Sequence, residues 1–101
     1  MQKEIELYEL IYLVDPTFTE QELTKKIEHY RNFLMSKGSK VMVQNSGRQN
    51  LSYDIKGFKT ANYLQMMYLG NGNIVNSLNK ELQRDSSILR HLTTKLNEVN
   101  K

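Results

Sequence analysis

The sequence predicts an α+β domain in which two helices cover one face of a four-stranded antiparallel sheet. The chain has 101 residues, 39% hydrophobic and 25% charged, which is ordinary for one domain with one core. Strand-like and helix-like segments alternate in the order strand, helix, strand, strand, helix, strand. Gly, Pro and Asn stand at the joins between these segments, as turns require.

The first strand is expected over residues 5–14, where β-forming residues follow one another. Apolar side chains occupy both alternating faces of this segment, so we expect it to lie in the middle of the sheet. Asp15-Pro16 ends the strand.

The first helix is expected to begin after Thr19, which is a candidate N-cap with Glu22 three residues further on. This is the spacing of a capping box, and Phe18 and Leu23 occupy the two positions of a hydrophobic staple. Lys37-Gly38 is expected to end the helix. Its buried face repeats at helical spacing through Leu23, Ile27, Tyr30 and Leu34.

The next two strands surround the segment "GRQNLSYDI", residues 47–55. A second strand is expected from Val41 toward Gly47, where the backbone bends and holds Arg48 at the rim. The segment 51–55 is strand-like, and its residues Leu51, Tyr53 and Ile55 alternate onto one face. The segment 56–61, "KGFKTA", is expected to be the loosest, and a third strand covers roughly 62–69.

A second helix is expected after the turn residues Asn71-Gly72-Asn73, with Asn73 as its N-cap. Ile74, Leu78 and Leu82 share its buried face. The last strand is expected over 88–94, followed by a polar tail from about 96. This order is the split βαβ pattern of the ferredoxin-like fold, here as one domain over residues 1–101. One face of the sheet is left bare and free to bind.

Charge is divided unevenly along the chain. Residues 1–30 carry three Lys against seven acidic residues, a balance of −4, whereas residues 31–101 carry eleven Lys or Arg against four acidic residues, a balance of +7. This asymmetry indicates that one part of the surface meets a polyanion.

The sequence offers little for catalysis or for a cofactor. The absence of Cys excludes disulfides and thiolate metal sites, and no stretch has the length of a membrane span. His29 and His91 lie far apart, and neither has a nucleophile or carboxylate partner in the local sequence. We therefore expect no enzyme, no metal site and no cofactor.

One alternative is a free protein that binds single-stranded RNA as an RNA-recognition motif does. Lys56-Gly57-Phe58 begins like the aromatic signature of that motif, and Tyr63 matches its eighth position. Thr60 stands where a stacking aromatic residue is expected. Tyr8 or Tyr12 on the first strand would supply the other stacking site.

Three segments in order resemble one family: "YELIYLVDP" (8–16), "GRQNLSYDI" (47–55) and "ILRHLTTK" (88–95). Together they closely resemble the ribosomal protein S6 family of the bacterial and plastid small subunit. The likeness extends over nearly all of residues 5–96. "YLQMMYLGNG" followed by "RHLTTK" is most similar to the cyanobacterial and chloroplast branch.

The resemblance implies a structural component of the small ribosomal subunit that works in translation. Such proteins bind small-subunit (16S) ribosomal RNA as a pair with ribosomal protein S18, beside other small-subunit proteins. Gly47-Arg48, Arg90 and Lys95 match the family pattern, and these cations suit phosphate contacts. The row Leu7, Ile11 and Leu13 on the first strand is offered to a protein partner if the alternate residues face the helices, unless the tail covers it. The full set of candidate RNA contacts is Arg48, Lys56, Lys59, Arg84, Arg90, His91 and Lys95.

Departures from the family pattern make the chain less basic: Gln49 and Gln83 stand where basic residues are common, Asp54 stands where Pro is common, and Glu4 and Glu6 stand where relatives can be basic. These departures indicate that binding depends less on RNA and more on the protein partner. Ten Asn and ten Lys indicate an AT-rich genome, and we expect no transit peptide before the first strand. The expected location is the ribosome of the plastid stroma, or alternatively of the bacterial cytoplasm.

Overall fold

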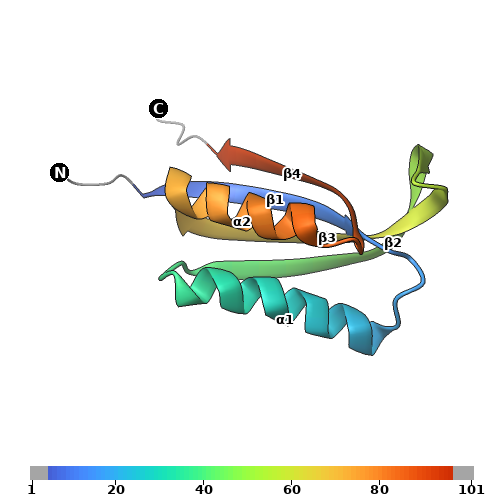
Figure 1. The fold of residues 1–101 in the computed structure, drawn as a ribbon, viewed down its shortest axis with the longest axis horizontal. Helices are drawn as coiled ribbons and strands as arrows, with labels where there is room; N and C mark the ends of the chain where they lie inside the picture. Colours follow the sequence, from blue (N-terminus) through green and yellow to red (C-terminus); the bar gives the residue numbers. More distant parts are fainter. Residues whose placement is uncertain (1–4, 97–101) are drawn as a thin grey trace.

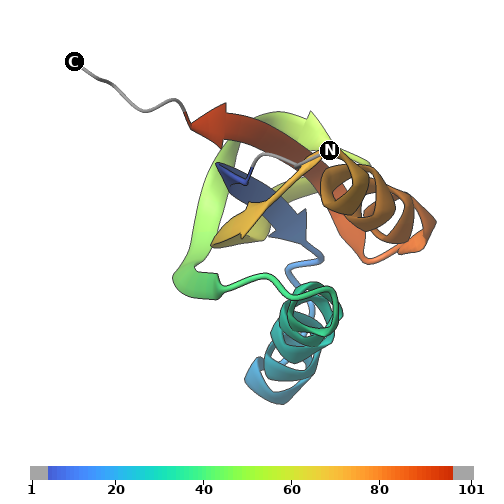
Figure 2. The same cartoon turned by 90° about the vertical axis from the view of Figure 1, so that its left-hand side faces the viewer.

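In the computed structural model, which describes residues 5–96, four strands form one antiparallel sheet in the order β2-β3-β1-β4. Both helices lie on one face of it (Figures 1 and 2). The predicted ferredoxin-like fold is therefore confirmed, with the first strand in the interior of the sheet. The elements are β1 (Glu6–Val14), α1 (Glu20–Ser36), β2 (Val41–Ile55), β3 (Phe58–Gly70), α2 (Gly72–Arg84) and β4 (Ile88–Leu96).

The ends of α1 follow from local sequence. The Glu22 amide donates to Thr19 Oγ1 at 3.1 Å, and the Thr19 amide donates to Glu22 Oε1 at 2.8 Å. This capping box satisfies two amides that the first helical turn cannot pair, and the acidic side chains suit the positive end of the helix dipole. Lys37 caps the other end, and Gly38 follows with a φ of +89°.

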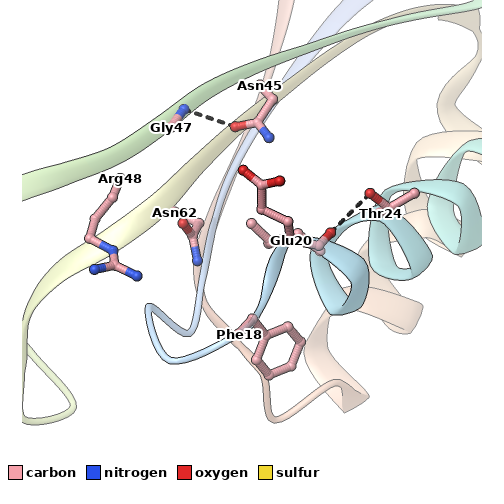
Figure 3. Close-up of a pocket in the computed structure, with 8 residues that line it drawn as sticks. Phe18, Glu20, Thr24, Asn45, Gly47, Arg48 and Asn62 are labelled. Carbon is pink, nitrogen blue, oxygen red and sulfur yellow. Dashed lines mark hydrogen bonds between the residues drawn. The ribbon is translucent and has the colours of Figure 1, made fainter.

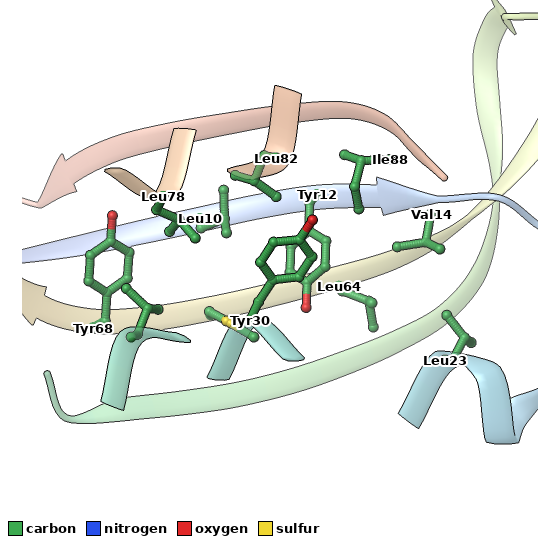
Figure 4. Close-up of a cluster of buried hydrophobic side chains, with 12 residues drawn as sticks. Leu10, Tyr12, Val14, Leu23, Tyr30, Leu64, Tyr68, Leu78, Leu82 and Ile88 are labelled. Atoms are coloured by element: carbon green, nitrogen blue, oxygen red, sulfur yellow. The ribbon is translucent and has the colours of Figure 1, made fainter. Parts of the chain in front are cut away.

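The core lies between the sheet and the helices (Figure 4). On β1, Leu10, Tyr12 and Val14 are fully buried, and Tyr8 packs beside them. Because side chains alternate along a strand, the intervening residues of β1 are on the opposite, bare face. Ile27, predicted for the buried face of α1, packs at the edge of the core and is only partly buried. The other buried members are Leu23, Tyr30, Leu34, Leu64, Met66, Tyr68, Leu78, Leu82 and Ile88.

A polar network joins α1 to the turn between α2 and β4. Asp85 Oδ2 accepts from Tyr30 Oη at 2.6 Å and from Lys26 Nζ at 2.7 Å. Ser87 donates to the other carboxylate oxygen through its amide and its hydroxyl. Burial alone would raise the pKa of Asp85, but these hydrogen bonds outweigh it and hold the pKa well below its usual range.

The hairpin of β2 and β3 is longer than the sequence predicted, and its register shifts between Asn50 and Ile55. The expectation that residues 56–61 are the loosest segment is wrong. Lys56 and Gly57 have φ angles of +52° and +85°, as a two-residue hairpin turn with two left-handed residues requires. Phe58 already pairs with Ile55 and begins β3. The Lys-Gly pair therefore makes a tight turn that lets both strands continue to it.

A bulge bends β2 where the sequence predicted a bend. The register with β3 shifts between Asn45 and Arg48, so three steps along β2 match two steps along β3. Gly47 lies in the shift with a φ of +81°, and its amide donates to Asn45 Oδ1 at 2.8 Å. The predicted role of Gly47 is confirmed.

Two boundaries differ from expectation. The N-cap of α2 is Asn71 rather than Asn73, because β3 continues to Gly70 and Asn71 keeps an extended backbone. Asn71 Oδ1 accepts from the Ile74 amide at 3.1 Å, and Asn73 falls inside the first turn. Leu96, where the polar tail was expected to begin, is the last residue of β4; residues 97–101 lie outside the described part of the chain.

Candidate nucleic-acid interface

A groove at one end of the molecule brings together four of the seven residues that the sequence nominated for RNA contact. Lys56 comes from the hairpin turn, Arg84 from the last turn of α2, and Arg90 and His91 from β4. They line a groove of about 530 Å³ with the backbone of the α2–β4 turn. The hairpin is long enough to bring its turn to α2 and β4, although residues 56 and 84 are far apart in sequence.

The groove has a net positive charge. Its one carboxylate, Asp85, is already bound to Lys26 at 2.7 Å. Arg84 is 3.8 Å from Glu81, but the arginine is largely exposed, so this pair neutralises it only weakly. Lys56 and Arg90 make no ion pair within residues 5–96. Three cations around one groove form a surface that attracts phosphate.

Arg90 is held by an aromatic residue, Tyr53, that no sequence motif singles out as an RNA contact. Its Nη1 donates to Tyr53 Oη at 3.0 Å, and its guanidinium carbon lies 5.7 Å from the centre of the Tyr53 ring. Tyr53 is more than half exposed. The contact of Tyr53 with Arg90 joins β2 to β4, which are not neighbours in the sheet, so the alternation of residues along β2 could not predict it. An exposed ring beside a guanidinium can stack an unpaired base.

His91 differs from the other nominated residues. It pairs with Tyr12 in the sheet register and is only partly exposed. Burial lowers the pKa of His91 below its ordinary value of 6.5, so the ring is neutral at pH 7. His91 therefore offers the groove a hydrogen bond and no charge.

The remaining three nominated residues lie away from the groove. Arg48 stands at the bulge, where its Nη2 donates to the Pro16 carbonyl at 2.8 Å. Lys59 is on the hairpin arm, 3.6 Å from Asp54 and largely exposed. Lys95 is five positions beyond Arg90 on β4, about 17 Å away at the usual rise of a strand. The nominated cations are therefore spread over more than one surface.

The nominated partner row lies on the bare face of the sheet. Leu7, Ile11 and Leu13 alternate along β1, opposite the core residues. Leu13 is partly covered by the hairpin, where it packs against a second cluster, and it is partly buried as Leu7 and Ile11 are. Sequence alternation could not predict this cover, which comes from the far end of β2 and β3. The second cluster contains Ile55, Ala61, Leu89, Leu13, Leu51 and Phe58.

Neighbouring strands extend the apolar row. Leu69 of β3 pairs with Leu7, and Leu92 of β4 pairs with Ile11. Leu69 is 39% exposed and Leu92 is 61% exposed. Glu9 interrupts the row and accepts a hydrogen bond from Gln65. Large apolar side chains left exposed on a sheet face mark a surface for another macromolecule.

The structure removes two residues from the RNA-recognition-motif alternative. Tyr12 is 0% exposed, and Tyr8 stacks on Tyr68 with ring centres 5.6 Å apart on the helix side of the sheet. Neither ring can stack a base on the bare face. Phe58 is partly buried in the second cluster, which leaves only Tyr63 of the proposed aromatic set on that face.

Within residues 5–96, no group of His, Cys, Asp and Glu could hold a metal ion, and no helix is long and apolar enough to cross a membrane. His29 is exposed and lies 3.9 Å from Glu81. The fold and the groove define a ferredoxin-like domain that offers a basic groove and an apolar sheet face.

Residues 7–95 match the family described as Ribosomal protein S6, and the chain belongs to this family. It is 44% identical over 88 residues to small ribosomal subunit protein bS6c of Guillardia theta, covering 86% of this chain and 92% of that protein. It is 39% identical to bS6c of Porphyra purpurea, covering 93% and 85%. It is 34% identical to bS6 of the cyanobacterium Rippkaea orientalis, covering 90% and 74%.

A solved structure supports the same fold. The 30S ribosomal protein S6 of Thermotoga maritima superposes with a TM-score of 0.86 at 20% identity, covering 92% of this chain and 89% of that one. The predicted family and its cyanobacterial and chloroplast branch are thus confirmed. So is the prediction that the chain is a ribosomal protein of the small subunit rather than an enzyme.

Proposed function

We propose that this protein binds small-subunit ribosomal RNA through the basic groove at the hairpin turn. The observation that carries the proposal is the meeting of Lys56, Arg84 and Arg90 from three separate elements around one groove. Their charges are not cancelled there, because the carboxylate of Asp85 is bound to Lys26. Arg90 and Tyr53 add a place where a base can stack beside a phosphate contact.

The contact is mainly electrostatic and involves few phosphates. Gln83 also lines the groove. It is uncharged, whereas the family pattern favours a basic residue at this position. Three groove cations would give a fall in log affinity of roughly 2.7 per tenfold rise in salt on duplex RNA, at about 0.9 per phosphate. Arg48, Lys59 and Lys95 then serve as outlying contacts, outside the groove.

Ribosomal protein S18 occupies the bare sheet face in this proposal. Leu7, Ile11, Leu69 and Leu92 form the apolar row that it covers. When a partner packs on such side chains, each Å² of apolar surface removed from water stabilises the complex by roughly 25 cal/mol. The RNA groove opens at the end of the sheet where Arg90 pairs with Leu13, so both contacts can form at once.

We further propose that residues 1–101 act as one domain in a ribosome of the plastid stroma or the bacterial cytoplasm. Support comes from the bS6c relatives in algae and the bS6 relatives in cyanobacteria.

The test is assembly of the protein into the small subunit. Wild-type protein added to small subunits that lack it, with S18 present, should sediment with them through sucrose. The variant Lys56→Glu/Arg84→Glu/Arg90→Glu should stay at the top of the gradient. Lys80→Glu, on the exposed surface of α2 and outside the groove, is the matched control and should sediment like wild type. Sedimentation of the triple variant with the subunit at the wild-type level would refute the proposed groove.

A further inference from the structure

A second groove, of about 440 Å³, lies between the start of α1 and the bulge of β2 (Figure 3). It is separate from the basic groove and shares no residue with it. Its walls combine one aromatic ring, two side-chain amides, one carboxylate and one guanidinium. These are Phe18, Asn45, Asn62, Glu20 and Arg48.

Hydrogen bonds fix the two amides and the guanidinium. Asn62 is only 4% exposed, and its Nδ2 donates to the Asp15 carbonyl at 3.0 Å. Asn45 accepts the Gly47 amide through Oδ1 at 2.8 Å, so its Nδ2 is left as a donor. Arg48 uses one N–H on the Pro16 carbonyl and keeps others for a ligand.

The carboxylate of Glu20 is available at the opposite wall. It points from the first residue of α1 toward the Asn45 side chain (Figure 3). Among residues 5–96 it makes no ion pair. The capping box of α1 uses the carboxylate of Glu22, so the carboxylate of Glu20 is not engaged in it. The groove therefore presents a free acceptor facing free donors, beside the partly buried ring of Phe18.

We propose that this groove binds the guanine of an unpaired ribonucleotide, an inference that rests on the proposed RNA-binding function. Guanine presents two adjacent N–H donors, N1 and N2, on its Watson–Crick edge, which suit a carboxylate such as that of Glu20. Its O6 and N7 accept hydrogen bonds, which suit Arg48 and Asn45. The Phe18 ring supplies an aromatic surface for stacking.

Other ligands fit this groove less well. Adenine and cytosine offer one amino group beside an acceptor, and uracil offers one N–H between two acceptors. None of these three bases can therefore donate two adjacent hydrogen bonds to one carboxylate. A bare phosphate would meet the negative charge of Glu20. An added peptide strand would meet the bulge between Asn45 and Arg48, where the edge of the sheet is interrupted.

The test is a titration of the 15N-labelled protein with mononucleotides, followed by NMR. GMP should shift the backbone amides of Gly47 and Arg48 and the side-chain amide of Asn45. It should bind about tenfold more tightly than AMP, CMP or UMP. IMP, which lacks only the N2 amino group, should also bind about tenfold more weakly than GMP. Glu20→Gln should remove the preference for GMP over IMP, whereas Glu28→Gln, an exposed carboxylate on the same helix outside the groove, should keep it.

Equal responses to all nucleotides and to inorganic phosphate would overturn the inference and indicate a simple anion site. A response of the groove to S18 without any response to GMP would overturn it in favour of a protein contact. Both results leave the basic groove intact as an RNA site, since that claim depends on Lys56, Arg84 and Arg90. If the variant Lys56→Glu/Arg84→Glu/Arg90→Glu sedimented with the small subunit like wild type while GMP was still preferred, only the proposed function of the basic groove would be refuted.

Discussion

Replacing Asp85 by Asn removes a charge that ties α1 to the base of the basic groove. The carboxylate accepts four hydrogen bonds, from Lys26, Tyr30 and twice from Ser87, at 2.6 to 3.0 Å. The Lys26 and Asp85 side chains are only 22% and 14% exposed, so water compensates little. Hydrogen bonds to charged groups contribute roughly 1.5–3 kcal/mol each, and bonds that share one carboxylate are not additive. We expect Asp85→Asn to lower the free energy of unfolding by about 2–4 kcal/mol.

The effect of Asp85 should depend on pH. The pKa of Asp85 in the folded protein lies below its ordinary value of 3.8. Its contribution to stability is therefore fully present above that ordinary value and is lost as the pH falls through the lower folded value. The difference between wild type and Asp85→Asn should be large at about pH 7 and should shrink at about pH 2.5.

Urea unfolding of both proteins at the two pH values measures these differences. The matched control is Asp54→Asn, whose partner Lys59 is 3.6 Å away and largely exposed. This control should change stability by less than about 0.5 kcal/mol. If Asp85→Asn were as stable as Asp54→Asn at neutral pH, the network would not hold α1 in place and the reasoning would be refuted.

Three further predictions concern the bulge and the bare face. Gly47→Val should lower the free energy of unfolding in urea by roughly 1–3 kcal/mol, because a φ of +81° strains a β-branched residue although no atom lies within 4 Å of the added Cβ. Gly47→Asn should lower it less, and equal losses in the two variants would contradict the backbone explanation. Arg48→Ala should cost about 1 kcal/mol for the lost bond to the Pro16 carbonyl, and an unfolded variant in the same assay would show a larger structural role. Leu92→Asp should fold like wild type, because Leu92 is 61% exposed, but should lose binding to S18 in calorimetry; retained binding would move the partner off the bare face.

Local signals predicted the elements of this fold well. The capping box of Thr19 and Glu22 and the bend at Gly47 are both properties of a few adjacent residues. The N-cap of α2 was predicted at the wrong residue because Asn71 and Asn73 are both good caps, and only the length of β3 decides between them. The Lys-Gly turn was missed because Lys rarely adopts a positive φ, so the pair resembled a loop.

The site was harder to predict than the fold. The sequence nominated Lys56, Arg84 and Arg90, but could not show that a long hairpin brings the first beside the other two. Neither could it show that Tyr53 holds Arg90, since that contact joins strands that are not neighbours in the sheet. Charge and motif therefore identify candidate cations, and only the topology separates those that meet from those that do not.

The most direct measurement of the central claim is the salt dependence of binding to small-subunit ribosomal RNA, with S18 present. If Lys56 and Arg90 each neutralise one phosphate of duplex RNA, the slope of log affinity against log salt should become shallower by about 0.9 in each of the single variants Lys56→Ala and Arg90→Ala. Lys80→Ala, outside the groove, should leave the slope unchanged. Slopes for Lys56→Ala and Arg90→Ala that equal the wild-type slope would mean that the basic groove does not contact phosphate, which would contradict the account.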